Sequence, residues 1–217
     1  MWQVFDEKWG EQGPPDFGVV RTIVLKGPGV ETDGDSLAVV VVFPDDKLKT
    51  IAPFYDQKKN PLWAQARSDG WLTGEFRQLY GRPQIWRGYP GDQGPPNLKG
   101  KAMGIYSAKL GIPLEPDFIA SFTSPDSDKL HAANGVTGSL VGTTSAGSDL
   151  PEGNLSVVHF HNNLKQAKGL VDMFNEKKPP FDEIVAAGVL KEPIRGAAYQ
   201  VVSDKTDEAA IKKLMGA

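Results

Sequence analysis

The chain has 217 residues and a formal net charge of −3, and 40% of its residues are hydrophobic, so it can bury a substantial core. It contains no cysteine, which excludes disulfides, a thiolate nucleophile and cysteine-based zinc or iron–sulfur sites, and leaves the redox compartment undetermined. Acidic and basic residues are interleaved, so the sequence has no polybasic groove for a nucleic-acid backbone.

No apolar run approaches the length that crosses a bilayer, and residues 1–8 lack the basic-then-apolar start of a secretory signal. We therefore expect a soluble chain. Secretion or injection without a conventional signal peptide is left open. The high content of glycine and proline favours a loop-rich fold with many short strands.

The N-terminal part of the chain predicts two strands and then a helix. Residues 17–25 and 36–43 are β-branched apolar runs that end at turns containing proline. An Asn-Pro pair at residues 60–61 is a helix start signal, and this helix is expected to break at Gly70 before it resumes. We predict that residues 1–81 form a β-rich and helical subdomain.

Two short strands in the middle of the chain carry polar side chains that suit a binding site. Residues 84–88 form an apolar-aromatic strand that ends in Arg87. Residues 118–124 form a second strand, in which Ser121 and Thr123 share one face because side chains alternate along a strand. Both strands therefore present groups that can bind a polar ligand.

The segments around these strands alternate between loops and helices. The glycine- and proline-rich residues 88–100 predict a loop, and residues 101–110 a short helix. Residues 126–134 predict a further helix, and the Gly-, Ser- and Thr-rich residues 138–153 an exposed loop.

The C-terminal part of the chain predicts a strand at residues 155–160 and an amphipathic helix that begins after Asn162 or Asn163. Residues 181–202 read as two strands around a tight bend, with Glu183 at the start of the first strand. Thr206 is expected to cap a peripheral helix at the end of the chain.

In this order, an Arg that ends one strand, a Ser-x-Thr strand and a Glu that opens a third resemble the Arg-Ser-Glu class of ADP-ribosyltransferases, of the cholera- and pertussis-toxin type. The likeness extends from residue 82 to residue 204 and includes the Ile-Arg-Gly-Ala segment at residues 194–197. It implies an α+β fold with a split two-sheet β core, flanked by helices, around an NAD cleft. Residues 82–217 would then be the catalytic domain.

The resemblance also implies an activity and its residues. The chain would be a mono-ADP-ribosyltransferase of the toxin or effector type, which cleaves the nicotinamide–ribose bond of NAD and transfers ADP-ribose to a protein target. Glu183 would stabilise positive charge on the ribose, Ser121 would orient Glu183, and Arg87 would bind the NAD phosphates. The cofactor-binding residues implied are Arg87, Gly88, Ser121, Thr123, Trp86 and Tyr106.

The sequence also allows three other interpretations. Phe181 stands where members that modify arginine carry Glu, which leaves a non-arginine acceptor, simple NAD hydrolysis or lost activity open. His159 and His161 share a strand face, with His131 as a third candidate ligand, but no carboxylate lies at a telling spacing and we expect no metal. The third is a non-enzymatic, β-rich interaction or assembly module that uses the five tryptophans as core or contact aromatics.

Overall fold

The computed structural model describes residues 18–28, 35–56, 61–70, 81–89, 98–113, 122, 124–145 and 152–214. The strands are β1 (Arg21–Pro28), β2 (Asp35–Val42), β3 (Gly81–Gly88), β4 (Ala102–Leu110), β5 (Val136–Thr144), β6 (Leu155–His161) and β7 (Leu190–Thr206). The helices are the short 3-10 helix η1 (Asp45–Lys47), α2 (Leu48–Tyr55), α3 (Pro61–Ser68), α5 (Pro125–Ala133), α6 (Leu164–Asn175), α7 (Phe181–Ala186) and α8 (Glu208–Leu214).

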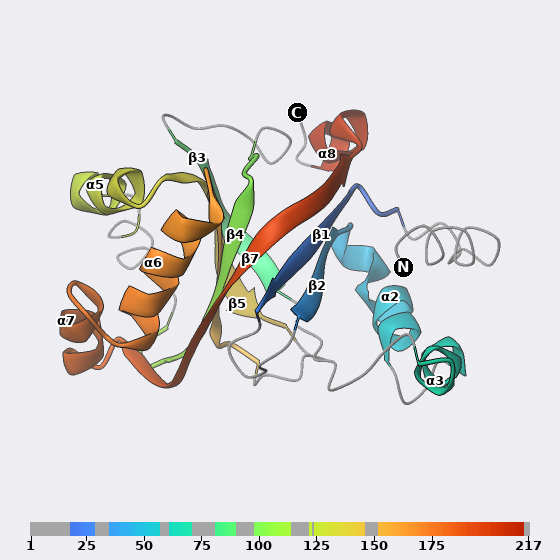
Figure 1. The fold of residues 1–217 in the computed structure, drawn as a ribbon, viewed down its shortest axis with the longest axis horizontal. Coiled ribbons are helices and arrows are strands. Elements are labelled where there is room, and N and C mark those ends of the chain that lie inside the picture. Colours follow the sequence, from blue (N-terminus) through green and yellow to red (C-terminus); the bar gives the residue numbers. More distant parts are fainter. Residues whose placement is uncertain are drawn as a thin grey trace.

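All these strands hydrogen-bond into one antiparallel sheet with the order β2-β1-β7-β4-β6-β5-β3. The four strands from β4 to β7, with α5 and α6 between them, follow a β-α-β-β-α-β path with the order β7-β4-β6-β5, which is the ferredoxin-like arrangement. Strands β1 and β2 extend this unit at one edge and β3 extends it at the other. In Figure 1, α5, α6 and α7 lie on one side of the sheet, and α2 and α3 lie beside β1 and β2.

Local sequence signals explain where α5 and α6 begin. The Ser124 side chain accepts a hydrogen bond from the backbone N–H of Ser127, and the Asn163 side chain accepts one from that of Gln166. Each cap satisfies a donor at the start of its helix. Along α6 the buried residues recur at helical spacing, and they are Ala167, Leu170, Val171 and Phe174. This apolar stripe packs α6 against the sheet.

Both faces of the sheet carry a hydrophobic cluster. The face under α6 carries one hydrophobic cluster, which includes Tyr106, Val141 and Val157. The opposite face carries a second cluster, which includes Met103 and Phe160. The central strands contribute alternate residues to the two clusters, so both faces of those strands carry buried apolar side chains.

The C-terminal strand β7 pairs with β1, the first strand of the described chain, and with β4. β7 pairs with β1 through one half of its length and with β4 through the other. At the β1 end, the Arg21 guanidinium donates to both carboxylate oxygens of Asp204, at 3.0 and 2.7 Å, and to the Leu98 carbonyl. Arg21 is 2% exposed, so this is a largely buried ion pair.

The fold agrees in part with the sequence predictions. The α+β class and the flanking helices are confirmed, and most predicted strands and helices are present within the described residues. The split into two sheets is not confirmed, because the strands form one sheet. The predicted boundary at residue 81 falls where β3 begins, and a separate N-terminal subdomain stays a prediction.

Three predicted elements are wrong. Residues 101–110 form β4 and not a helix, because pairing with β6 and β7 outweighs the helix propensity of Ala, Met and Leu. The predicted loop at residues 138–153 contains most of β5. Residues 181–186 form helix α7, in which Asp182 and Glu183 occupy the first turn as the helix dipole favours. The predicted Ser-x-Thr strand lies largely outside the described residues.

Among the described helices, none is both long enough and apolar enough to cross a membrane.

Candidate functional site

The sheet register brings polar side chains from three strands into one row. Arg87 on β3 pairs with Ser139 on β5, Ser139 pairs with His159 on β6, and His159 pairs with Gly104 on β4. Directly paired residues point to the same face of a sheet. His161 and Tyr106 lie two positions further along β6 and β4, so their side chains share this face, which α5 and α6 cover.

His159 lies at the centre of the site and is 6% exposed. Its Nδ1 forms a hydrogen bond of 2.7 Å with the Ser139 hydroxyl. Its ring stacks on Phe122 with an interplanar angle of 14° and a centroid separation of 5.9 Å. It also contacts the rings of Tyr106 at 5.1 Å and His131 at 4.9 Å. With Nδ1 engaged by Ser139, Nε2 is the nitrogen through which His159 would act on a ligand.

His161 is fully buried, and its tautomer follows from its surroundings. Its Nδ1 lies 3.0 Å from the Asn134 carbonyl, and a carbonyl can only accept, so Nδ1 carries the hydrogen. The lone pair of the neutral ring is therefore on Nε2. That nitrogen is buried and has no hydrogen-bond partner among the described residues.

The third histidine comes from the helix that covers this face. His131 lies near the end of α5 and is 3% exposed. Its ring packs against Tyr89 at 5.1 Å and Phe122 at 5.2 Å. Its Nδ1 is buried without a hydrogen-bond partner in the part of the chain that the structure describes. The three histidines form one cluster, although His131 lies on a different element from His159 and His161.

Tyr106 reaches this cluster because its neighbour on the strand is a glycine. A Cβ atom at Gly104 would lie 2.5 Å from the Tyr106 hydroxyl oxygen, so the tyrosine ring occupies the space above Gly104. The ring meets His159 and Phe174 edge-on, at 5.1 and 5.2 Å. The Tyr106 hydroxyl is buried and makes no hydrogen bond within the described residues.

An ion pair closes the cluster at the β3 edge. Arg87 Nη2 donates to Asp128 Oδ2 on α5 at 2.9 Å, and the guanidinium carbon lies 5.2 Å from the centre of the Tyr89 ring. Oδ1 of the same carboxylate is buried with no hydrogen-bond partner among the described residues. The ion pair therefore fixes α5 to the sheet and leaves one carboxylate oxygen directed inward.

The described chain concentrates its unsatisfied polar groups here. Every buried side-chain nitrogen or oxygen without a hydrogen-bond partner in the described part belongs to this cluster. They include atoms of Tyr106, Asp128, His131 and His161. Native proteins leave few such groups, and those that exist commonly meet a ligand, an ion or water. We call the residues Arg87, Tyr89, Tyr106, Phe122, Asp128, His131, Ser139, His159 and His161 the histidine cluster.

Burial keeps the imidazoles of the cluster neutral. It lowers the pKa of His131 to about 4, an effect that the negative charge of Asp128 partly opposes and that Arg87 and His161 reinforce. Burial likewise lowers the pKa of His159 well below its usual value, with further lowering from His131 and His161. The pKa of His161 is lowered mainly by burial, although the hydrogen bond to Asn134 raises it. Burial raises the pKa of Tyr106, so this hydroxyl stays protonated.

The structure brings some of the predicted site residues together, and another lies at the surface. Arg87 and Tyr106 lie in the histidine cluster, and Gly88 ends the strand that carries Arg87. Glu183 is exposed in the first turn of α7. Ser121, Thr123 and the Trp86 side chain lie outside the described residues. The roles proposed for these residues stay predictions.

Sequence reasoning missed part of the cluster. The alternation of His159 and His161 was visible, and His131 was named as a third member. Ser139 lies in a segment that was predicted to be a loop. Asp128 lies one helical turn before His131, but this spacing indicates a shared site only when the position of α5 against the sheet is known. Within the described residues, no group of three or more histidine or acidic side chains is arranged to hold a metal ion.

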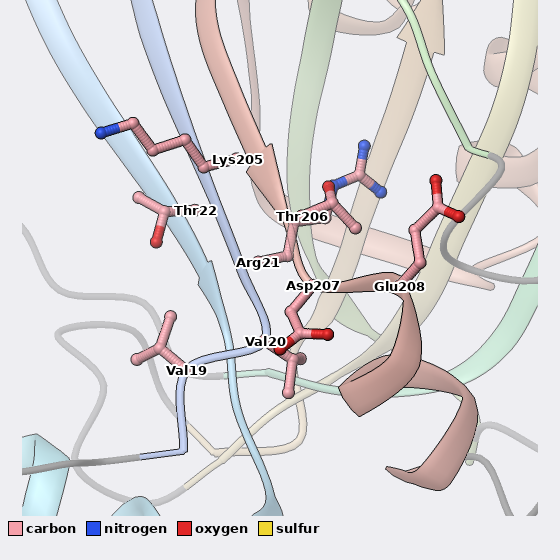
Figure 2. A pocket seen from close by; sticks show the side chains of 8 residues that line it. All are labelled: Val19, Val20, Arg21, Thr22, Lys205, Thr206, Asp207 and Glu208. Carbon is pink, nitrogen blue, oxygen red and sulfur yellow. The ribbon is translucent and has the colours of Figure 1, made fainter.

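An open hollow of about 670 Å³ lies elsewhere, where β1 meets the end of β7 and the start of α8. Its charged side chains do not converge, since Lys205 and Glu208 project to opposite sides of it in Figure 2. Arg21, which also lines it, is engaged by Asp204. The hollow shares no residue with the histidine cluster, which remains the better candidate site.

Two solved structures are similar to this chain. An anthrone oxidase-like protein matches with a TM-score of 0.60 and 12% identity, over 95% of this chain and 86% of that one. A protein from Fusobacterium nucleatum, whose assignment as a monooxygenase is provisional, matches with a TM-score of 0.50 and 12% identity, over 94% and 86%. No protein-family model and no curated protein sequence matches. At such identity, the likeness shows the fold alone.

These comparisons correct the predicted family. The resemblance to ADP-ribosyltransferases is wrong, because the chain forms a single sheet and its fold matches these two structures instead. The predicted transferase, NAD glycohydrolase and toxin or effector activities depended on this resemblance and are wrong as well. NAD binding and a protein target were implied only by that resemblance, and they stay untested predictions.

Proposed function

We propose that this protein is an oxidase or monooxygenase that acts on a small, flat aromatic compound bound at the histidine cluster. The observation that carries the proposal is the concentration of unsatisfied polar atoms in one buried, aromatic-lined site. The names of the two proteins with a similar fold support the choice of reaction class.

The polar atoms of the cluster favour a ligand that carries both a hydrogen-bond donor and an acceptor. Nε2 of His161 offers a fixed lone pair and suits a phenolic hydroxyl on the ligand. The protonated hydroxyl of Tyr106 is a donor and suits a ketone oxygen. The rings of Tyr89 and Phe122, which pack against His131, give the cluster an aromatic lining. A hydroxylated aromatic ketone such as a hydroxyanthrone combines these features.

The proposed chemistry begins with proton abstraction. Neutral His159 removes a proton from the activated CH₂ group of the ketone, and Tyr106 donates to the oxygen on which negative charge develops. The resulting carbanion transfers electrons to molecular oxygen. The CH₂ group becomes C=O, one oxygen atom is incorporated and the other leaves as water, so each turnover consumes one O₂. Charge stabilisation by Tyr106 is effective because the site is shielded from water.

The test compares matched tyrosine variants while oxygen uptake and quinone formation are followed. Tyr106→Phe removes the hydroxyl of the cluster, and Tyr199→Phe removes one that belongs to the opposite face of the sheet. We expect Tyr106→Phe to lower kcat about tenfold or more and Tyr199→Phe to leave it unchanged. His159→Gln should lower kcat by about 10²-fold or more.

Circular dichroism and thermal unfolding must show that each variant is folded. An absence of oxygen uptake by folded wild-type protein, across a series of hydroxylated aromatic ketones, would overturn the proposal. Equal losses in Tyr106→Phe and Tyr199→Phe would show that the histidine cluster is not the site.

A further inference from the structure

The centre of the histidine cluster is buried. Its three histidines are each no more than 6% exposed, and the side chain of Ser139 between them is fully buried. The hollow in Figure 2 shares no residue with the cluster and gives no access to it. A flat aromatic ligand can therefore reach these side chains only if an element that covers them moves.

One of the two helices that contact the cluster is held firmly. α6 buries four apolar side chains, including Phe174, whose ring contacts that of Tyr106. Asn175, the last residue of α6, also makes two hydrogen bonds to the backbone of Gly196. Displacement of α6 would expose this apolar surface to water and break both hydrogen bonds.

The other helix, α5, lacks such an apolar attachment, although it lies on the same side of the sheet (Figure 1). Its one buried side chain is His131. Burial of this ring is costly, because Nδ1 has no hydrogen-bond partner among the described residues. Leu130 is only half-buried, and Ala132 and Ala133 are exposed. Local opening starts where few apolar contacts hold an element, so α5 should open more readily than α6.

An ion pair that water can reach holds the first half of α5 to the sheet. Arg87 Nη2 on β3 donates to Asp128 Oδ2 at 2.9 Å. The two side chains are 17% and 38% exposed. Exposed ion pairs contribute little to stability because solvent screens them, so this contact can break and form again.

Backbone contacts hold the other end of α5 more firmly. The Asn134 carbonyl accepts a hydrogen bond of 3.0 Å from Nδ1 of the buried His161. The next carbonyl, of Gly135, accepts one from the backbone N–H of Asn162. Gly135 itself is buried and has a φ of 60°, which suits glycine at a sharp turn. This end of the helix therefore stays in place when the ion pair breaks.

We propose that α5 is a lid over the histidine cluster, which pivots about residues 134–135 and opens when the ion pair between Arg87 and Asp128 breaks. In the closed state the His131 ring lies 4.9 Å from that of His159, centre to centre. Opening carries His131 away and exposes His159. The proposal rests on the proposed function for what passes the lid, a flat aromatic substrate.

The test uses single thiols, because the chain contains no cysteine of its own. Ser139→Cys places a thiol in the histidine cluster, on the strand that α5 contacts, and Ala108→Cys places one in the hydrophobic cluster under α6. Both positions are 0% exposed. The rate of reaction with DTNB, an aromatic disulfide, is measured without substrate or denaturant. Each rate is divided by that of the same variant unfolded in urea.

We expect Ser139→Cys to react about tenfold or more faster than Ala108→Cys. Adding Asp128→Ala should raise the rate at Ser139→Cys about fivefold and leave that at Ala108→Cys unchanged, because only the lid is released. The matched control is Asp126→Ala, which removes a carboxylate from the same helical turn, where the side chain is 91% exposed. It should change neither rate.

A second pair of variants probes the same opening from the helices and keeps the Ser139 hydroxyl. His131→Cys lies on α5 and Ala167→Cys on α6, and both positions are buried. His131→Cys should again react about tenfold or more faster. Circular dichroism and urea unfolding establish that each variant is folded and how stable it is.

Equal rates within both pairs would overturn the lid. So would an acceleration by Asp128→Ala that is as large at Ala108→Cys as at Ser139→Cys, since that result reports a loss of global stability. Because labelling needs no substrate, these outcomes bear on the lid alone. An absence of oxygen uptake by the folded wild-type protein would overturn the proposed function alone.

Discussion

The three histidines are buried as neutral rings, and this lowers the stability of the folded chain in acid. A histidine whose pKa is lower in the folded chain than in the unfolded chain binds fewer protons when folded. Below the unfolded pKa of about 6.5, protons therefore favour the unfolded chain. The stability associated with the neutral state is complete above that pH and is lost as the pH falls toward the folded pKa, which is about 4 for His131.

The free energy of unfolding should therefore fall between about pH 7 and pH 5, and His131→Gln should reduce this fall by about 2 kcal/mol. The glutamine cannot be protonated, so one of the three histidine contributions disappears. Urea unfolding at the two pH values measures the difference. An equal fall in wild type and His131→Gln would mean that His131 is already protonated, or well hydrated, in the folded protein.

At the scale of elements, Asn175 fixes the end of α6 to β7. Its amide accepts from the Gly196 N–H at 2.7 Å and donates to the Gly196 carbonyl at 3.0 Å. The residue thus satisfies both polar groups of one backbone unit in the middle of a long strand. The pairing holds the helix over the part of the sheet that carries Tyr106, because Gly196 pairs with Tyr106.

Asn175→Ala should lower the free energy of unfolding by about 2–3 kcal/mol, since both hydrogen bonds are lost and two backbone groups are left partly buried and unpaired. Asn162→Ala, in the exposed connection that precedes α6, should change it by less than about 0.5 kcal/mol. Chemical denaturation of the two variants gives the comparison. A loss below about 1 kcal/mol for Asn175→Ala would show that water replaces the amide.

Local signals predicted the helices with clear caps but not the elements that depend on distant partners. Asn163 marked the start of α6 because its cap lies within one turn of sequence. β4 resembled a helix in composition, and only its position between β6 and β7 makes it a strand. For α7 the local signals were present, namely acids in the first turn and Gly188, with φ 73°, after the end. The short apolar run that follows Glu183 favoured a strand prediction instead.

The candidate site was predictable only in part for the same reason. His159 and His161 share a face by alternation along one strand, which sequence reveals. That Arg87, Ser139 and His159 form a row depends on β3, β5 and β6 being neighbours, and no local pattern specifies that order. The long-range pairing of strands therefore limits how much of the site the sequence can predict.

At the scale of the whole molecule, the buried pair of Arg21 and Asp204 connects the two ends of the described chain. Arg21→Met keeps much of the packing against Phe160, whose ring centre lies 5.1 Å from the guanidinium carbon. It removes the guanidinium that donates to the Leu98 carbonyl and pairs with the Asp204 carboxylate. The free energy of unfolding should fall by about 3 kcal/mol.

The exposed pair of Asp126 and Lys129 is the control, and Asp126→Asn should cost less than about 1 kcal/mol. Urea unfolding of both variants distinguishes a buried ion pair from an exposed one. Similar losses in the two variants would contradict the view that the Arg21 pair closes the fold.

The position of β7 also sets the order in which the chain can fold during its synthesis. β1 and β2 leave the ribosome before β7 and can pair with each other. The other side of β1 pairs with β7 only after β7 has been made, and Arg21 then meets a carboxylate 183 residues later. Domains form as units while the nascent chain emerges, and contacts between distant segments form slowly. Until β7 has been made, β1 and β2 therefore present an open strand edge, and chains that stall before residue 190 would be the species most in need of a chaperone.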